Sequence, residues 1–244
     1  MKNTFDVLSA SYESILTSDL RISGENAEYF AHYKARRIQK TLGENFKGKV
    51  LDYGCGIGSV VRSLRSFPEM RRADIYGYDV SQESINVCRN NVQNVHFLTH
   101  LADSFRGFFD VVILSNVLHH VQIEKRDVLV QSVLRLLTKN AWLFIFEHNP
   151  LNPLTRMVVK ASPIDKDASL VGAWHMARLL QRNGVTNSRL SFIVFFPRIL
   201  KCLRFMEPFL GFLPIGAQYM CVARGPAGTD HLQSHRIFDK ESGQ

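Results

Sequence analysis

Apolar runs of strand length alternate along the middle of this chain with amphipathic segments of helix length. The runs that predict strands lie at 49–53, 73–79, 95–98, 109–116 and 141–147. The run at 109–116 is almost continuously apolar, which is typical of a central strand in a parallel sheet. Segments between the runs, at 60–67, 81–91 and 124–137, have the apolar spacing of helices. This alternation predicts a doubly wound α/β sheet.

Both ends of the chain depart from this alternation. Apolar residues at three-and-four spacing predict two helices before the first strand, the second ending near Gly43. Residues 150–171 form an insertion that opens with a short helix at Asn152-Pro153, and a helix follows at 174–181. A last pair of antiparallel strands is predicted at 191–196 and 217–224, with a short helix at 197–212 between them. The organisation predicted is one domain over 1–225, with an N-terminal helical part at 1–45, an insertion or cap at 150–185 and a polar, flexible tail at 226–244.

Composition places the chain among soluble globular proteins. It has 244 residues, 45% of them apolar and 21% charged, which suits one large α/β domain, although two small domains are compatible with the length. The net charge of +8 fits an anionic substrate, nucleic acid or an anionic membrane surface as partner. Cationic residues are dense from Lys34 to Lys40, and on a helix such a run is more often a solvated face than a binding patch.

Cysteine and hydropathy patterns indicate the cytoplasm. The four cysteines form no C-x-x-C pair, so neither a zinc knuckle nor a redox motif is predicted. Asp6 and Glu13 interrupt the apolar stretch at the N-terminus, which disfavours a signal peptide. No run reaches the roughly 18 uncharged apolar residues that span a bilayer. Segment 192–213 is apolar with basic residues at helical spacing, which fits a core-facing helix or, alternatively, peripheral contact with a membrane.

Three glycines at alternate positions follow the first predicted strand, as Gly54-x-Gly56-x-Gly58. Glycine lets the backbone approach a ligand closely at a strand–turn–helix junction, where nucleotide-like cofactors bind. The third glycine comes one residue earlier than in the dinucleotide fingerprint. Asp79 ends the second strand, where its carboxylate can accept hydrogen bonds from both hydroxyls of a ribose.

On the glycine turn and Asp79, together with the segment at 115–120, the chain resembles the class I S-adenosylmethionine-dependent methyltransferases. A Rossmann-like domain for another nucleotide is the alternative. The resemblance implies a seven-stranded sheet of order 3-2-1-4-5-7-6 with an antiparallel last strand, and S-adenosylmethionine as cofactor, converted to S-adenosylhomocysteine. Family members often hold the adenine through an acidic residue after the third strand; Asp103 is displaced from that place, so backbone groups of Leu101 and Ala102 are expected there instead. The cofactor-binding residues implied are Asp52, Gly54, Cys55, Gly56, Gly58, Asp79, Val80, Leu101, Ala102, Ser115, Asn116 and Val117.

Ionisable side chains follow the fourth and fifth strands, where this fold binds its acceptor. His120 and His148 are the predicted bases for the acceptor proton, and His119 and Glu147 are further catalytic candidates. The resemblance also implies an N-terminal helical lid, and the residues predicted to contact the acceptor are Tyr12, Tyr33 and Arg156. No metal-ligand spacing accompanies the histidines, so no metal is predicted.

The resemblance implies methyl transfer to an oxygen, nitrogen or carbon nucleophile of a small molecule. The motifs look like those of enzymes from bacterial biosynthetic clusters for polysaccharides and natural products. A nucleic-acid methyltransferase is the first alternative. Enzymes of that kind that act on exocyclic amines usually carry Asn/Asp-Pro-Pro-aromatic after the fourth strand, where this chain reads Ser115-Asn116-Val117-Leu118. A non-catalytic protein that binds the cofactor is the second, and the intact turn and Asp79 speak against it.

Overall fold

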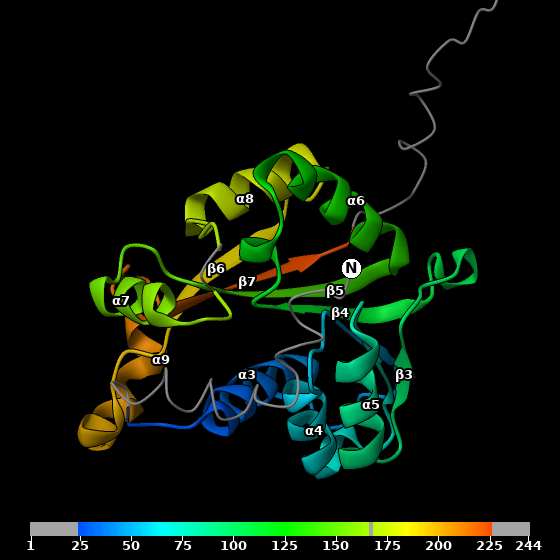
Figure 1. The fold of residues 1–244 in the computed structure, drawn as a ribbon, viewed down its shortest axis with the longest axis horizontal. Helices are drawn as coiled ribbons and strands as arrows, with labels where there is room; N and C mark the ends of the chain where they lie inside the picture. Colours follow the sequence, from blue (N-terminus) through cyan, green and yellow to red (C-terminus); the bar gives the residue numbers. More distant parts are fainter. Residues whose placement is uncertain (1–23, 166–167, 226–244) are drawn as a thin grey trace, which may run out of the picture.

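A single seven-stranded sheet organises the computed structural model of this chain, which describes residues 24–165 and 168–225 (Figure 1). β5 and the strands before it pair in parallel, whereas β7 runs antiparallel to both β5 and β6. The strands are β1 (Lys49–Tyr53), β2 (Asp74–Tyr78), β3 (His96–Leu98), β4 (Phe109–Ser115), β5 (Leu137–His148), β6 (Ser188–Ile193) and β7 (Gln218–Arg224). Their order, β3-β2-β1-β4-β5-β7-β6, confirms the predicted topology.

Helices cover both faces of the sheet (Figure 1). The α-helices are α3 (Ala27–Leu42), α4 (Ser59–Ser66), α5 (Gln82–Asn91), α6 (Arg126–Leu136), α7 (Pro153–Ala161), α8 (Ala173–Arg182) and α9 (Glu207–Leu210). The 3₁₀ helices are η3 (Pro68–Met70), η4 (Asp103–Phe105), η5 (Leu118–His120), η6 (Ile123–Lys125) and η7 (Arg198–Met206). Apolar side chains of α3, α4 and α5 bury against one face and those of α6 and α8 against the other, so the sheet is the middle of three layers.

Local signals in the sequence fix the start of α3 and α5 and the end of α3. The Asn26 side chain accepts a hydrogen bond from the Tyr29 amide at 2.9 Å and so caps α3, which ends before Gly43 at φ 85°. The Ser81 hydroxyl accepts from the Ser84 amide at 3.1 Å at the start of α5, which confirms its predicted capping role.

The segment before the last strand differs from its prediction. β6 begins at Ser188 and ends at Ile193, whereas the apolar pattern predicted a strand at 191–196. Val194 adopts φ 62°, a left-handed conformation that breaks the strand. The helix predicted at 197–212 is a 3₁₀ helix followed by the short α9, because Leu200 is non-helical and Pro208 can only occupy the first turn of a helix.

Several predictions concern residues that the structure does not describe. The first N-terminal helix and Tyr12 fall within residues 1–23, and the polar tail falls within 226–244; all lie outside the described residues. The lid role of the N-terminal part and the cap role of 150–185 stay predictions. Among the described residues, every helix is too short or too polar to cross a bilayer.

Candidate active site

A cavity of about 370 Å³ opens where β1, β2, β4 and β5 end. It extends from the glycine turn after β1 to the histidines after β4 and β5, and α3 and α7 contribute to its walls. The carboxyl ends of the strands in such a sheet are where ligands bind. The predicted site residues on its walls are Asp52, Gly54, Cys55, Gly56, Asp79, Val80, Ser115, Asn116, Val117, His119, His120 and His148.

The three glycines of the turn have different surroundings. Gly54, Gly56 and Gly58 all have positive φ, between 53° and 79°. A side-chain carbon at Gly54 would lie 2.7 Å from Val117, and one at Gly58 would lie 3.0 Å from the Cys88 sulfur. At Gly56 the same atom would meet nothing within 4 Å. Gly56 therefore exposes backbone to the cavity. Gly58, which the sequence analysis also named as a cofactor-binding residue, packs against α5 and does not line the cavity.

The Asp79 carboxylate joins the glycine turn to the end of β2. It accepts a hydrogen bond from the Gly56 amide at 2.8 Å and one from the Ser81 amide at 2.9 Å. The residue also lies on the cavity wall beside Val80, which is 64% exposed. The two backbone amides therefore fix the position of the Asp79 carboxylate on the cavity wall.

Asp52, the next-to-last residue of β1, is almost completely buried and lines the cavity. Neither of its carboxylate oxygens has a hydrogen-bond partner among the described residues. Burial raises the pKa of Asp52 to about 7; Lys34 opposes this change and Asp79 adds to it. An unpartnered buried carboxylate is costly, so this position suits the polar or cationic group of a ligand.

Lys34 is a site residue that the sequence analysis missed, since the run from Lys34 to Lys40 was interpreted as a solvated face. Its side chain is buried, lines the cavity and donates a hydrogen bond from Nζ to Ser115 Oγ at 2.9 Å. Burial lowers its pKa to about 8, against the opposing effect of Glu147 and Asp52. The available signal was helical spacing, because Lys34 lies on the same face of α3 as the buried Ala31 and Ile38.

Leu101 and Ala102 do not line the main cavity. They line a second hollow of about 340 Å³, together with His100 and Asp103. Tyr53 and Tyr78 line both spaces, and their ring centroids lie 4.8 Å apart. The tyrosines at the ends of β1 and β2 separate Leu101 and Ala102 from the main cavity, and the backbone contact expected from these two residues stays a prediction.

The segment after β4 turns sharply at the cavity. Asn116 has φ 59°, a conformation that asparagine tolerates better than most residues, and η5 follows at once. The Oδ1 atom of Asn116 and the Oε1 atom of Gln218 are buried, and neither has a hydrogen-bond partner among the described residues. Sequence reasoning did not select Gln218. Both residues line the cavity and offer polar atoms to a ligand.

Glu147 is fully buried at the end of β5 and positions His119. Its Oε2 lies 2.6 Å from His119 Nδ1, and its Oε1 accepts a hydrogen bond from the Leu118 amide at 2.8 Å. Burial would raise the pKa of Glu147, but the adjacent His119 outweighs it and lowers that pKa. Since an ionised carboxylate only accepts, Nδ1–H of His119 is the donor. Glu147 does not line the cavity but fixes the ring of His119, and its predicted catalytic role stays a prediction.

Three histidines gather at the other end of the cavity. The His119 ring centroid is 4.1 Å from that of His120 and 5.3 Å from that of His148. Burial opposes a charge on His119, yet the Glu147 and Asp165 carboxylates raise its pKa to about 9. Burial, together with the charge on His119, lowers the pKa of His120 and of His148 to about 4. At neutral pH the cavity thus meets two uncharged imidazoles beside a protonated one.

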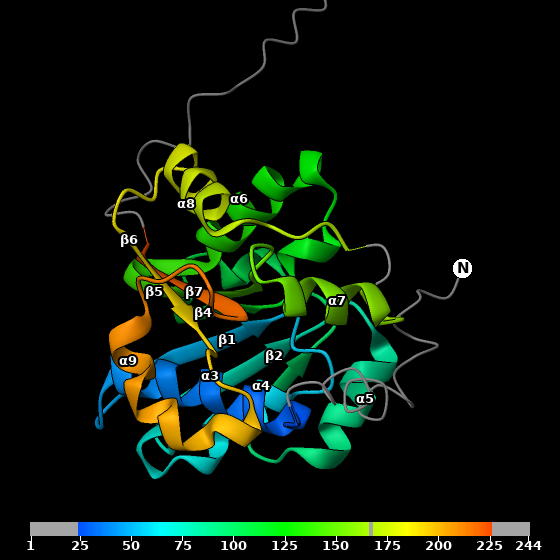
Figure 2. The same cartoon turned by 90° about the vertical axis from the view of Figure 1, so that its left-hand side faces the viewer.

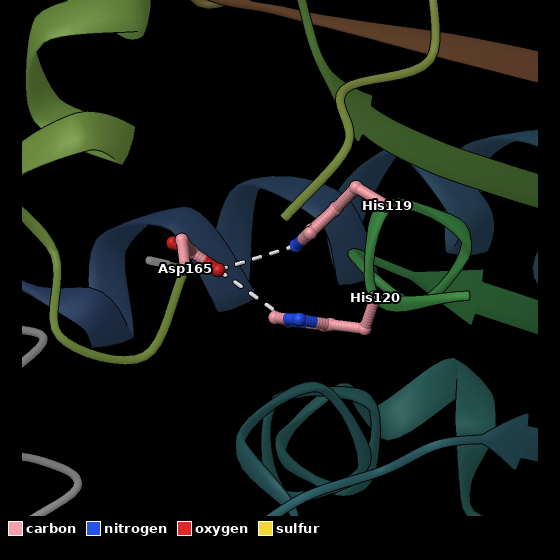
Figure 3. Close-up of side chains that lie close together, drawn as sticks. All are labelled: His119, His120 and Asp165. Carbon is pink, nitrogen blue, oxygen red and sulfur yellow. Dashed lines mark hydrogen bonds and ion pairs between the residues drawn. The ribbon is translucent and has the colours of Figure 1, made fainter. Parts of the chain in front are cut away.

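Asp165 lies across the cavity from η5, in the loop after α7 (Figure 3). Its Oδ1 is 3.3 Å from His119 Nε2 and 3.4 Å from His120 Nε2. Sequence reasoning treated this loop as a general place for acceptor specificity and did not select Asp165. No spacing rule could have found it, because it is 46 residues from His119.

Two residues predicted to contact the acceptor lie elsewhere. The Tyr33 hydroxyl donates to Glu207 Oε2 at 3.0 Å, since its place on α3, one residue before Lys34, turns it toward α9. Arg156 is exposed on α7, whereas Val158, two residues later, lines the cavity. Neither Tyr33 nor Arg156 lines the cavity, and their contact with an acceptor stays a prediction.

Comparison with known proteins agrees with the fold. The model of a family described as "Methyltransferase domain" matches residues 26–196. Ribosomal RNA small subunit methyltransferase C of Haemophilus influenzae is 30% identical over 108 residues, which are 43% of this chain and 32% of that protein. Demethylmenaquinone methyltransferase of Chlorobaculum tepidum is 28% identical over 103 residues, 42% of this chain and 40% of that protein. The chain thus aligns with about a third to two fifths of the length of these relatives.

Solved structures share the architecture at low sequence identity. A SAM-dependent methyltransferase from Archaeoglobus fulgidus superposes with a TM-score of 0.62 at 16% identity, covering 82% of this chain and 95% of that one. At that identity the likeness concerns the fold alone.

Proposed function

The chain belongs to the methyltransferase-domain family, whose cofactor is S-adenosylmethionine, and we propose that it transfers the cofactor's methyl group to a nucleophile of a small molecule. One observation carries the proposal: a single cavity connects the glycine turn and Asp79 to His120 and His148. Its volume of about 370 Å³ lies within the range of about 300–1,000 Å³ usual for small-ligand sites.

The residues at the glycine turn fit the cofactor. Gly56 presents backbone to the cavity with open space beside it, and Asp79 presents a carboxylate suited to ribose hydroxyls. The unpartnered carboxylate of Asp52 suits the ammonium group of the cofactor's methionine part. When bound, S-adenosylmethionine supplies a methyl group that its sulfonium centre has already activated.

At the opposite end, the chain's own residues hold the acceptor. The uncharged imidazole of His148 is half-buried on the cavity wall and can accept a hydrogen bond from the acceptor's nucleophilic group. Val158 and Ile164 add an apolar wall from α7 and the loop after it. Since the methyl group is already activated, most of the rate can come from holding nucleophile and methyl in line.

A size-resolved transfer assay tests the acceptor class. The protein is incubated with S-adenosylmethionine carrying a deuterated methyl group and an extract of its source cells, separated into RNA and low-mass fractions. We expect the label in the low-mass fraction. Val158→Trp should fill the acceptor end and abolish labelling while S-adenosylhomocysteine still binds. Met157→Trp, at an exposed neighbouring position, is the matched control and should label normally.

RNA is the competing acceptor, favoured by the name of one relative and by the net charge of +8. After β4 the chain reads Ser115-Asn116-Val117-Leu118 in place of Asn/Asp-Pro-Pro-aromatic. This difference argues against methyl transfer to the exocyclic amines of bases. The name of the second relative gives a small molecule as its acceptor. Label found in RNA in the assay above would overturn our proposal and support this alternative.

We also propose that residues 198–212, which comprise η7, α9 and the two residues after it, contact an anionic membrane surface. Ile199, Phe205, Phe209 and Phe212 are each more than 70% exposed, and the basic Lys201 is exposed among them. α7, whose Leu154 and Met157 are also more than half exposed, lies on the same side of the molecule (Figure 2). Apolar side chains with basic neighbours fit the interface of an anionic bilayer.

Sedimentation with lipid vesicles tests this contact. The protein should sediment with vesicles containing phosphatidylglycerol and remain in solution with neutral ones. Phe209→Ser together with Phe212→Ser should abolish sedimentation, whereas Val128→Ser, an exposed apolar position on α6, should not. Equal sedimentation of both variants would refute the proposed surface.

A further inference from the structure

We propose that His119, His120 and Asp165 form a binding site for a divalent transition-metal ion of the Zn²⁺ type. Their side chains point toward one another from two segments that face each other across the cavity (Figure 3). One ligand atom from each residue can be chosen so that all lie within 4.8 Å of one another. The inference does not require the proposed acceptor class, because metal binding can be measured with the metal alone.

The distances suit a small ion. His119 Nε2 and His120 Nε2 lie 3.3 Å and 3.4 Å from the same oxygen of Asp165. Two ligand atoms of a tetrahedral site with bonds of about 2.0–2.1 Å are roughly 3.3 Å apart, so little movement is needed to seat the ion. Two imidazoles and one carboxylate are donors that favour Zn²⁺ and its first-row neighbours over Mg²⁺ or Ca²⁺.

Glu147 supplies the support that a metal-binding histidine usually has. Its Oε2 accepts the Nδ1 hydrogen of His119 at 2.6 Å, which fixes the ring and directs Nε2 toward Asp165. A carboxylate on the far nitrogen of a ligating histidine orients the ring and strengthens its binding. The backbone of η5 is fixed as well, since the Leu118 amide donates to the other oxygen of Glu147.

Three protein ligands leave coordination positions for a molecule in the cavity. In catalytic zinc sites such positions hold water or substrate. An acceptor oxygen bound there would lose its proton more easily, because a cation stabilises the resulting anion. This second step rests on the proposed methyl transfer, whereas the metal site itself does not.

Titration with Co²⁺ as a spectroscopic substitute for Zn²⁺ tests the site. The full chain is treated with a chelator, dialysed and titrated with Co²⁺ alone, and binding is measured by visible absorption. Zn²⁺ is then added to displace the bound Co²⁺. We expect one ion per chain, and at least tenfold weaker binding in Asp165→Asn. Asp74→Asn is the matched control, since it removes a carboxylate from the exposed His96–Asp74 pair, and should bind as the wild type does.

Two results would overturn the site. One is wild-type affinity in Asp165→Asn. The other is loss of the signal in Cys202→Ser, which would place the ion on the exposed thiol instead. His120→Gln provides a second ligand variant, should Asp165→Asn fail to fold. Methyl transfer by a metal-free protein that binds no Co²⁺ would reject the metal while leaving the proposed function intact.

Discussion

Replacing Asp52 by asparagine should stabilise the ligand-free protein and weaken its hold on the cofactor. Burial disfavours the charged form of Asp52 in the folded chain, and its oxygens have no hydrogen-bond partner among the described residues. Asparagine has nearly the same shape without the charge. The buried carboxylate is therefore interpreted as a group kept for ligand binding at the expense of stability.

The magnitude follows from the pKa. The difference between about 7 in the folded chain and 3.8 in the unfolded one corresponds to at most about 4 kcal/mol. Because the folded pKa is the higher one, the folded chain binds more protons than the unfolded chain. The stability that protonated Asp52 contributes is therefore lost as pH rises from about 4 through about 7. Between pH 5 and pH 8 the variant should therefore gain about 2–3 kcal/mol relative to the wild type.

Urea unfolding at pH 5 and pH 8 measures this gain, and calorimetry with S-adenosylhomocysteine measures the cofactor affinity. Asp103→Asn, which removes an exposed carboxylate, is the control. Its stability relative to the wild type should not increase between pH 5 and pH 8. The reasoning is refuted if the stability difference between Asp52→Asn and wild type is the same at both pH values. It is also refuted if the variant binds S-adenosylhomocysteine as tightly as the wild type.

Three other variants test individual parts of the site. Asp79→Ala should weaken S-adenosylhomocysteine binding by about 1.5–3 kcal/mol in calorimetry, the scale for hydrogen bonds to a charged group, and unchanged affinity would remove Asp79 from the site. Gly54→Ala should lower the unfolding free energy by at least about 1–2 kcal/mol, because φ is 77° and the new carbon would lie 2.7 Å from Val117; full stability would contradict that geometry. His148→Ala should keep cofactor affinity and lose methyl transfer in the labelled assay, whereas wild-type turnover would make His148 structural.

The sequence was sufficient for the fold where a single physical rule governed each element. The almost continuously apolar strand at 109–116 and the glycine turn predicted a parallel sheet with a ligand at its carboxyl edge. Ser81 was predictable as a cap because capping depends on neighbouring residues only. The end of β6 was not, because the left-handed conformation of Val194 has no local signal in a β-branched residue.

The candidate site was predictable only where it follows the strand ends. Asp79 and His148 were selected by their position at the ends of apolar runs, Asp52 by the family resemblance, and all three line the cavity. Lys34 was missed because charge density was given more weight than its position on the buried face of α3. Asp165 was missed because it reaches the histidines through tertiary structure alone.

A crystal structure with S-adenosylhomocysteine would test the central claim most directly, that one cavity holds the cofactor at the glycine turn and the acceptor at the histidines. We predict the ribose at Asp79, the amino group of the ligand at Asp52 and the sulfur directed toward His148. A ligand bound in the second hollow beside Leu101, or one whose sulfur faces away from His148, would contradict the account.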